Sequence, residues 1–332
     1  MADAENAAAN PGARSDQTAN AVAFVAARRD SAEQLGAALG ELISDPDAFA
    51  LELRRGLTAL ADPSYIAMQR FIAPGIGPVL GVRWPLNAAV ARGFRRATRG
   101  DRPSQLLFLA DRLFREEHLE LRWFAFGLLE PALPSEPERT WQLMRRAARE
   151  ANDWITVDSL AHPYARGILL EAYRWAELEQ LVFSRSRWER RLVGSTIATM
   201  PFLDRTAGRE AAVARRALTL IGDVIGDDEA DVQKALSWAL RSMLLVDAAA
   251  VEAFCRREAA LAAESNDGHR AWVIRDVLGK LPDAAASEIR AVLGGVRRRA
   301  GVPATSRAAD VAARFGDFTA TTAGSAAEPP LA

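Results

Sequence analysis

Apolar residues recur along most of the chain at the spacing of an amphipathic helix. The stretches 106–113 and 213–221 each place Leu, Ala, Val or Ile at intervals of three and four residues, which is the signature of one helix face. Alanine, leucine, arginine and glutamate are abundant, and all four favour helices. No alternation of Val, Ile and Thr flanked by hairpin turns is present. The pattern predicts an all-α protein.

Turn-forming pairs divide this pattern into helices of roughly 12–20 residues, the ordinary length in globular proteins. The breaks are predicted at Asp45-Pro46, Asp62-Pro63, Pro74-Gly75, Gly100-Asp101, Leu133-Pro134, His162-Pro163, Gly226-Asp227 and Leu281-Pro282. Pairs of such helices form units of roughly 35–47 residues, the size of HEAT or armadillo repeats. We therefore predict a right-handed α-solenoid of HEAT-like helical repeats with a concave groove.

Composition at the two ends of the chain differs from that of the middle. Residues 1–17 are rich in small polar residues, and residues 303–332 end in a segment of Ala, Thr, Gly and Pro. We expect a disordered tail at each of these ends. Between them we predict a helical N-terminal extension over residues 18–47 and a HEAT-like repeat domain over residues 48–302.

The 332 residues comprise 49% hydrophobic and 26% charged residues, as in a soluble protein with a sizeable core. The sequence contains no apolar run of membrane-spanning length and no secretory signal. Cys255 is the single cysteine, and the three histidines show no metal-ligand spacing. These features predict a cytoplasmic protein with neither a metal site nor a membrane partner.

The charge is unevenly distributed. The net charge is −1, but residues 1–47 carry −5 and the rest carries +4. Phosphate binding depends on a local basic face rather than on the sum. Arginine clusters lie at residues 92–102, 145–149, 185–191 and 297–299, and they would make DNA binding sensitive to salt.

Three segments carry residues suited to chemistry. Trp154 and Asp158 are four residues apart and share one helix face. Arg187 and Arg191 align in the same way after Ser186, a candidate N-cap. Lys234, Trp238 and Arg241 form one stripe at helical spacing. If each segment occupies the same place in its repeat, their side chains converge on one groove.

A carboxylate, a guanidinium and two indoles suit the cleavage of an N-glycosidic bond in alkylated DNA. An alkylated purine is a cationic leaving group, and its departure builds positive charge on the sugar. A fixed carboxylate stabilises that charge and positions water, and indole faces attract cations. Arginine and lysine hold backbone phosphates.

These segments resemble a family signature. W-x-x-V-D at 154–158, W-x-R-R at 188–191 and Q-K-A-x-x-W-A-L-R at 233–241 are similar, in this order, to motifs of AlkD-type DNA alkylation repair glycosylases. The turn at 81–85 and the segment 116–120 are also similar to that family. The resemblance runs from about Phe49 to about Leu281. Ile155 stands where family members often carry an acid.

The resemblance implies a monomeric DNA glycosylase that removes cationic N3- and N7-alkylated purines from double-stranded DNA, without metal or cofactor. It places Asp158, Trp154, Trp238 and Arg191 in the active-site cleft. The domain 48–302 would then be the glycosylase domain. We add as expected DNA contacts the basic side chains Arg187, Arg190, Lys234, Arg241, Arg95 and Arg96.

Simpler interpretations exist for each residue. Trp154 and Trp238 taken alone would be core tryptophans, which is the place we predict for Trp123, Trp141, Trp175 and Trp188. Asp158 alone would be a cap or an intrahelical partner. Two other functions therefore stay open, a DNA-binding family member that does not excise small adducts, and a helical scaffold for another protein.

Overall fold

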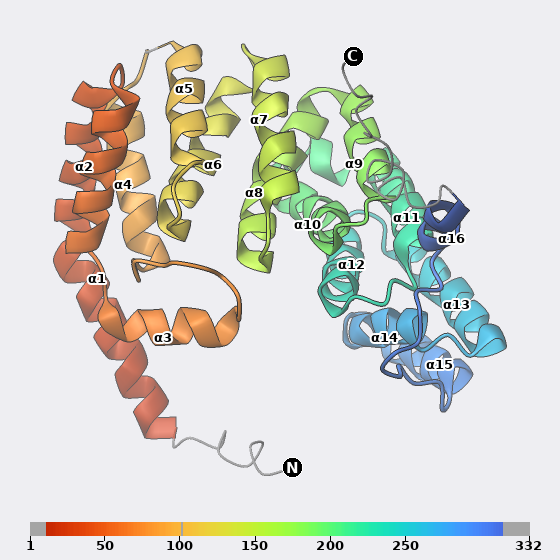
Figure 1. The fold of residues 1–332 in the computed structure, drawn as a ribbon. Helices are drawn as coiled ribbons and strands as arrows, with labels where there is room; N and C mark the ends of the chain where they lie inside the picture. The colour runs from red at the N-terminus through yellow and green to blue at the C-terminus, as the bar shows by residue number, and fades with distance from the viewer. Residues whose placement is uncertain (1–10, 101, 315–332) are drawn as a thin grey trace, which may run out of the picture. The chain divides into compact units, whose positions relative to one another are not determined.

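The computed structural model describes residues 11–100 and 102–314. These residues are helical throughout their regular structure, with no β-strand among them. Their helices pack on one another in the repeat-like manner of an α-solenoid, which confirms the predicted fold class (Figure 1). The right-handed sense and the groove stay predictions.

The chain forms two compact units, residues 1–147 and 148–332. The first contains α1 (Pro11–Leu39), the short η2 (Gly40–Leu42), α2 (Pro46–Ala59), α3 (Pro63–Ile72), α4 (Trp84–Ala97), α5 (Pro103–Leu113) and α6 (Leu119–Ala132). Helix α7 (Pro137–Glu150) crosses the boundary. Helix α1 packs along α4, and α5 packs along α6 and α2.

The second unit contains the residues with predicted chemistry. Its helices are α8 (Trp154–Leu170), α9 (Trp175–Leu181), α10 (Arg187–Leu203), α11 (Ala211–Val224), α12 (Ala230–Met243), α13 (Ala248–Ser265), α14 (Gly268–Val277), α15 (Asp283–Leu293) and α16 (Arg307–Arg314). The short turns η3 (Ala172–Arg174), η4 (Ala207–Arg209) and η5 (Leu278–Lys280) connect some of them. Helix α10 packs between α8 and α12, and α12 packs against α14. The second layer runs from α11 through α13 to α15.

Most of the predicted helix boundaries have a physical cause in the structure. Asp45 and Asp62 are N-caps whose carboxylates accept backbone N–H groups, and the proline after each opens the helix. The break predicted at His162-Pro163 is wrong, because α8 continues through Pro163 to Leu170. Proline removes a single N–H donor, and the buried residues on both sides of Pro163 hold the helix together.

The ends of the chain differ in part from the expected tails. Residues 11–17 belong to α1, and residues 307–314 form α16. Residues 303–306 precede α16 without regular secondary structure, and the rest of the two predicted tails, 1–10 and 315–332, lies outside the described residues. The boundaries of the extension and of the repeat domain stay predictions.

The tryptophans predicted for the core divide into two groups. Trp141 and Trp175 are buried, whereas Trp123 and Trp188 are half-buried. Trp188 is covered on its face by the Arg187 guanidinium, whose Cζ lies 4.7 Å from the ring centroid. At this helix start the indole face therefore contacts a charged side chain.

A glycine brings α10 close to α12. A Cβ added at Gly194 would lie 2.7 Å from the backbone carbon of Ala235, so only glycine permits this approach. The close packing fixes how far the side chains of α12 lie from those of α10. Gly194 therefore determines the geometry of the face that both helices share.

We predict that Gly194→Ala lowers the free energy of unfolding by about 1–3 kcal/mol, because overpacking forces the two backbones apart. Urea unfolding followed by circular dichroism measures the change. Gly222→Ala in α11 is the matched control, since its Cβ would meet Phe254 at an ordinary 3.6 Å. The control raises stability through helix propensity. Equal effects of the two substitutions would contradict the packing argument.

Candidate functional site

The first turn of α8 presents Trp154 and Asp158. Asp153 caps the helix by accepting the N–H of Thr156 at 2.8 Å, so α8 begins at Trp154. Trp154 and Asp158 then lie one turn apart on the same face. Both are half-buried, which rejects the interpretation of Trp154 as a core tryptophan.

The carboxylate of Asp158 is held by α10 through three hydrogen bonds. Arg191 donates from Nε to Oδ1 at 3.0 Å and from Nη2 to Oδ2 at 2.7 Å. Ser195 donates its hydroxyl to Oδ1 at 2.6 Å. A two-pronged guanidinium fixes a carboxylate in orientation as well as in position. Asp158 is therefore rigidly placed while 20% of its side chain stays exposed.

Arg191 connects three helices. Its side chain is only 7% exposed, its Nη1 donates to the backbone carbonyl of Asp231 on α12 at 2.7 Å, and its Cζ lies 5.7 Å from the Trp154 ring centroid. All three of its nitrogens thus have partners within the protein. This geometry favours a role in positioning Asp158 over the phosphate contact that the sequence suggested.

Ser195 was missed by the sequence analysis. It is completely buried on α10, one turn after Arg191. The spacing of four residues between an arginine and a serine was a usable signal, but serine is common in helices and the signal is weak by itself. In the structure, Ser195 and Arg191 together donate the hydrogen bonds to the Asp158 carboxylate.

Helix α12 presents Lys234, Trp238 and Arg241 as the predicted stripe. Lys234 is exposed, and Trp238 and Arg241 are half-buried, so Trp238 is not a core tryptophan. Among the described residues, Lys234 pairs with no carboxylate. Trp238 lies on α12, which packs against α10. The Asp231 carbonyl of α12 also accepts a hydrogen bond from Arg191, the residue that binds Asp158.

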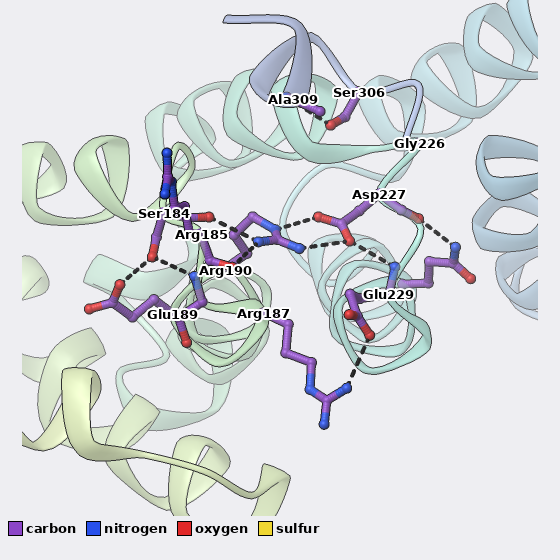
Figure 2. A network of polar contacts seen from close by, with 12 residues as sticks. Ser184, Arg185, Arg187, Glu189, Arg190, Gly226, Asp227, Glu229, Ser306 and Ala309 are labelled. Atoms are coloured by element: carbon purple, nitrogen blue, oxygen red, sulfur yellow. Dashed lines mark hydrogen bonds and ion pairs between the residues drawn. The ribbon is translucent and has the colours of Figure 1, made fainter. Parts of the chain in front are cut away.

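Two neighbouring arginines of α10 have different surroundings. Arg190 donates to both carboxylate oxygens of Asp227, at 2.6 and 3.3 Å, and to the carbonyls of Ser184 and Arg185. Figure 2 shows Arg190 inside this network and Arg187 extending away from it to Glu229. The guanidinium of Arg190 is used within the fold, so we retain Arg187 and leave Arg190 out of the proposed DNA contacts.

Two of the three remaining arginines, Arg241 and Arg96, also have acidic neighbours. Arg241 pairs with Asp276 of α14. In the first unit, Arg96 pairs with Glu33 at 2.9 Å, whereas Arg95 is exposed near the end of α4. Two of the predicted DNA contacts, Arg241 and Arg96, therefore already pair with a carboxylate of the protein.

The described residues lack the features of two other kinds of site. Within residues 11–100 and 102–314, no cluster of three or more His, Cys, Asp or Glu side chains has the arrangement of a metal site. None of the described helices has the length and apolar character needed to cross a membrane.

The region that contains Trp154, Asp158, Arg191 and Trp238 matches a known protein family. The sequence model of a family described as DNA alkylation repair enzyme matches residues 53–275. The match includes α8, α10, α12 and most of α14. No curated protein matches the chain significantly.

We predict that Arg191→Met lowers the free energy of unfolding by about 3–5 kcal/mol, toward the lower end because Asp158 keeps some contact with solvent. The substitution leaves a partly buried carboxylate without its cation. Chemical denaturation measures the loss.

The matched control is Arg256→Met on α13, which breaks an exposed ion pair with Glu288. Its expected effect is within about 1 kcal/mol. If Arg191→Met costs no more than this control, the Asp158 ion pair does not stabilise the fold.

Proposed function

This chain belongs to the DNA alkylation repair enzyme family, and we propose that it is a DNA glycosylase. Its reaction is hydrolysis of the N-glycosidic bond of cationic N3- and N7-alkylated purines in double-stranded DNA. The observation that carries the proposal is the carboxylate of Asp158, held by Arg191 and Ser195 and still open to solvent on one side.

The chemistry needs a fixed negative charge beside the deoxyribose. As the bond between sugar and purine breaks, the electron pair leaves with the purine, which becomes neutral, and the sugar becomes an oxocarbenium ion. Asp158 stabilises this ion and orients the water that attacks the anomeric carbon. Because Arg191 and Ser195 hold the carboxylate before DNA binds, little reorganisation is required during the reaction.

The indoles of Trp154 and Trp238 complete the proposed site. Both are half-buried and leave part of the ring open. Their faces pack on the sugar of the damaged nucleotide and attract its developing positive charge. Lys234, seven residues from Arg241 and about 10 Å away along the helix, flanks Trp238 with a cation for the DNA backbone.

We predict that Asp158→Asn lowers the rate of base release by at least about 100-fold, the scale on which a lost electrostatic group slows an enzyme. Trp238→Ala also lowers the rate. The assay measures release of N7-methylguanine and N3-methyladenine from methylated duplex DNA. Glu288→Gln, which removes a distant exposed carboxylate, is the control for the change in charge.

Unfolding curves of the same variants show whether they remain folded. Release at the wild-type rate by folded Asp158→Asn and Trp238→Ala would refute the assignment of the site. DNA binding without release by the wild-type protein would instead indicate a family member that does not excise small adducts. No binding of DNA would leave the scaffold interpretation.

We predict that Lys234→Ala weakens binding to duplex DNA and makes the slope of log affinity against log salt shallower by about 1, because one phosphate contact is lost. Fluorescence anisotropy over a series of salt concentrations measures the slope. Lys280→Ala is the control, since Lys280 is the other lysine of the chain and lies on η5 outside the α12 stripe. Equal slopes for both variants would contradict the contact.

A further inference from the structure

The helix pair α12 and α14 repeats the polar arrangement around Asp158. Asp276 on α14 accepts a hydrogen bond from the Ser237 hydroxyl at 2.7 Å and pairs with the Arg241 guanidinium. Ser237 and Arg241 are four residues apart on α12, as are the arginine and serine that hold Asp158 on α10. Trp272 also precedes Asp276 by four residues. The chain thus contains a second carboxylate held by an arginine and a serine.

The two arrangements differ in their exposure to solvent. The side chains of Asp276 and Arg241 are 43% and 30% exposed, against 20% and 7% for Asp158 and Arg191. The buried pair is fixed by the cost of separating its charges. The exposed pair contributes little to stability, since water and salt screen it. Its two partners can therefore separate when another ion competes.

Arg241 also keeps part of its hydrogen-bonding capacity. In the described part of the chain, its contacts with Ser237 and Asp276 all use Nη1. The edge formed by Nε and Nη2 can receive an anion in the two-pronged geometry that guanidinium offers to phosphate. Lys234 lies on the same stripe and pairs with no carboxylate among the described residues, which gives a DNA strand a second anchor.

We propose that Asp276, paired with Nη1 of Arg241 in the free protein, offsets the charge of this guanidinium and so weakens its attraction for a DNA phosphate at the Nε and Nη2 edge. The carboxylate is thus an internal competitor that lowers affinity for undamaged DNA. This inference rests on the proposed function, because it requires the α12 stripe to face DNA. Asp276 tunes binding, whereas Asp158 acts on the reacting sugar. The side chain of Asp276 is more exposed to solvent than that of Asp158, and this difference distinguishes the two roles.

The test is the affinity of Asp276→Asn for an undamaged, fluorescein-labelled duplex, measured by anisotropy at several salt concentrations. The amide keeps the shape of the side chain and removes the charge. We expect binding to tighten by about 2- to 5-fold at about 0.1 M salt, the range that an exposed ion pair can contribute. The gain shrinks as salt increases, because screening weakens the competing pair. Weaker or unchanged binding overturns the proposal.

Two further variants separate local competition from a general change in charge. Glu288→Gln removes a more exposed ion pair with Arg256 in the same unit, and we expect no comparable gain from it. Arg241→Gln should abolish the gain, so that the double variant Arg241→Gln with Asp276→Asn binds no better than Arg241→Gln. A gain that persists without Arg241 overturns the proposal.

The experiment also distinguishes this inference from the proposed function. If the wild-type protein binds the duplex but releases no alkylated base, the glycosylase proposal fails. The duplex affinities of the Asp276 and Arg241 variants still show whether Asp276 weakens binding. If the wild-type protein does not bind DNA, both fail. If release occurs and Asp276→Asn does not tighten binding, only the competition is wrong.

Discussion

The ion pair between Asp158 and Arg191 is the interaction on which the candidate site depends. Arg191 is almost fully buried, so its charged guanidinium needs partners within the protein. It finds them in the Asp158 carboxylate on α8 and the Asp231 carbonyl on α12. A single side chain of α10 therefore fixes the relative positions of three helices. The indoles of Trp154 and Trp238 take their places from the same helices.

This arrangement resolves a physical conflict in the proposed chemistry. A carboxylate that stabilises an oxocarbenium ion must be charged and must also be shielded enough for its charge to act strongly. Shielding also costs the carboxylate part of its hydration, which other polar groups must replace. The bidentate arginine and the Ser195 hydroxyl supply hydrogen bonds to the Asp158 carboxylate from one side. The other side keeps its access to solvent, where a substrate would lie.

Much of the fold follows from local signals in the sequence, and some of the site does not. The Asp-Pro pairs mark helix starts because both residues act locally, as cap and as first helical residue. The spacing of Trp154 and Asp158 likewise requires only a helix. Pro163 misleads because tertiary packing overrides its local effect. The contrasting places of Arg190 and Arg191 depend on which neighbouring helix each one meets, and this information is not local.

The pairing of arginines with acids explains how a chain of nearly neutral charge can belong to a family that acts on DNA. Arg190, Arg191 and Arg241 each contact a carboxylate of the protein, so the number of arginines overstates the number of cations free for phosphate. In the proposed function, binding to ordinary DNA is therefore expected to be weaker than the number of arginines suggests. Discrimination then has to come from the damaged nucleotide itself, through the positive charge that its base carries and its sugar develops. In the proposed reaction the side chain that responds to that charge is Asp158, which Arg191 and Ser195 hold in place.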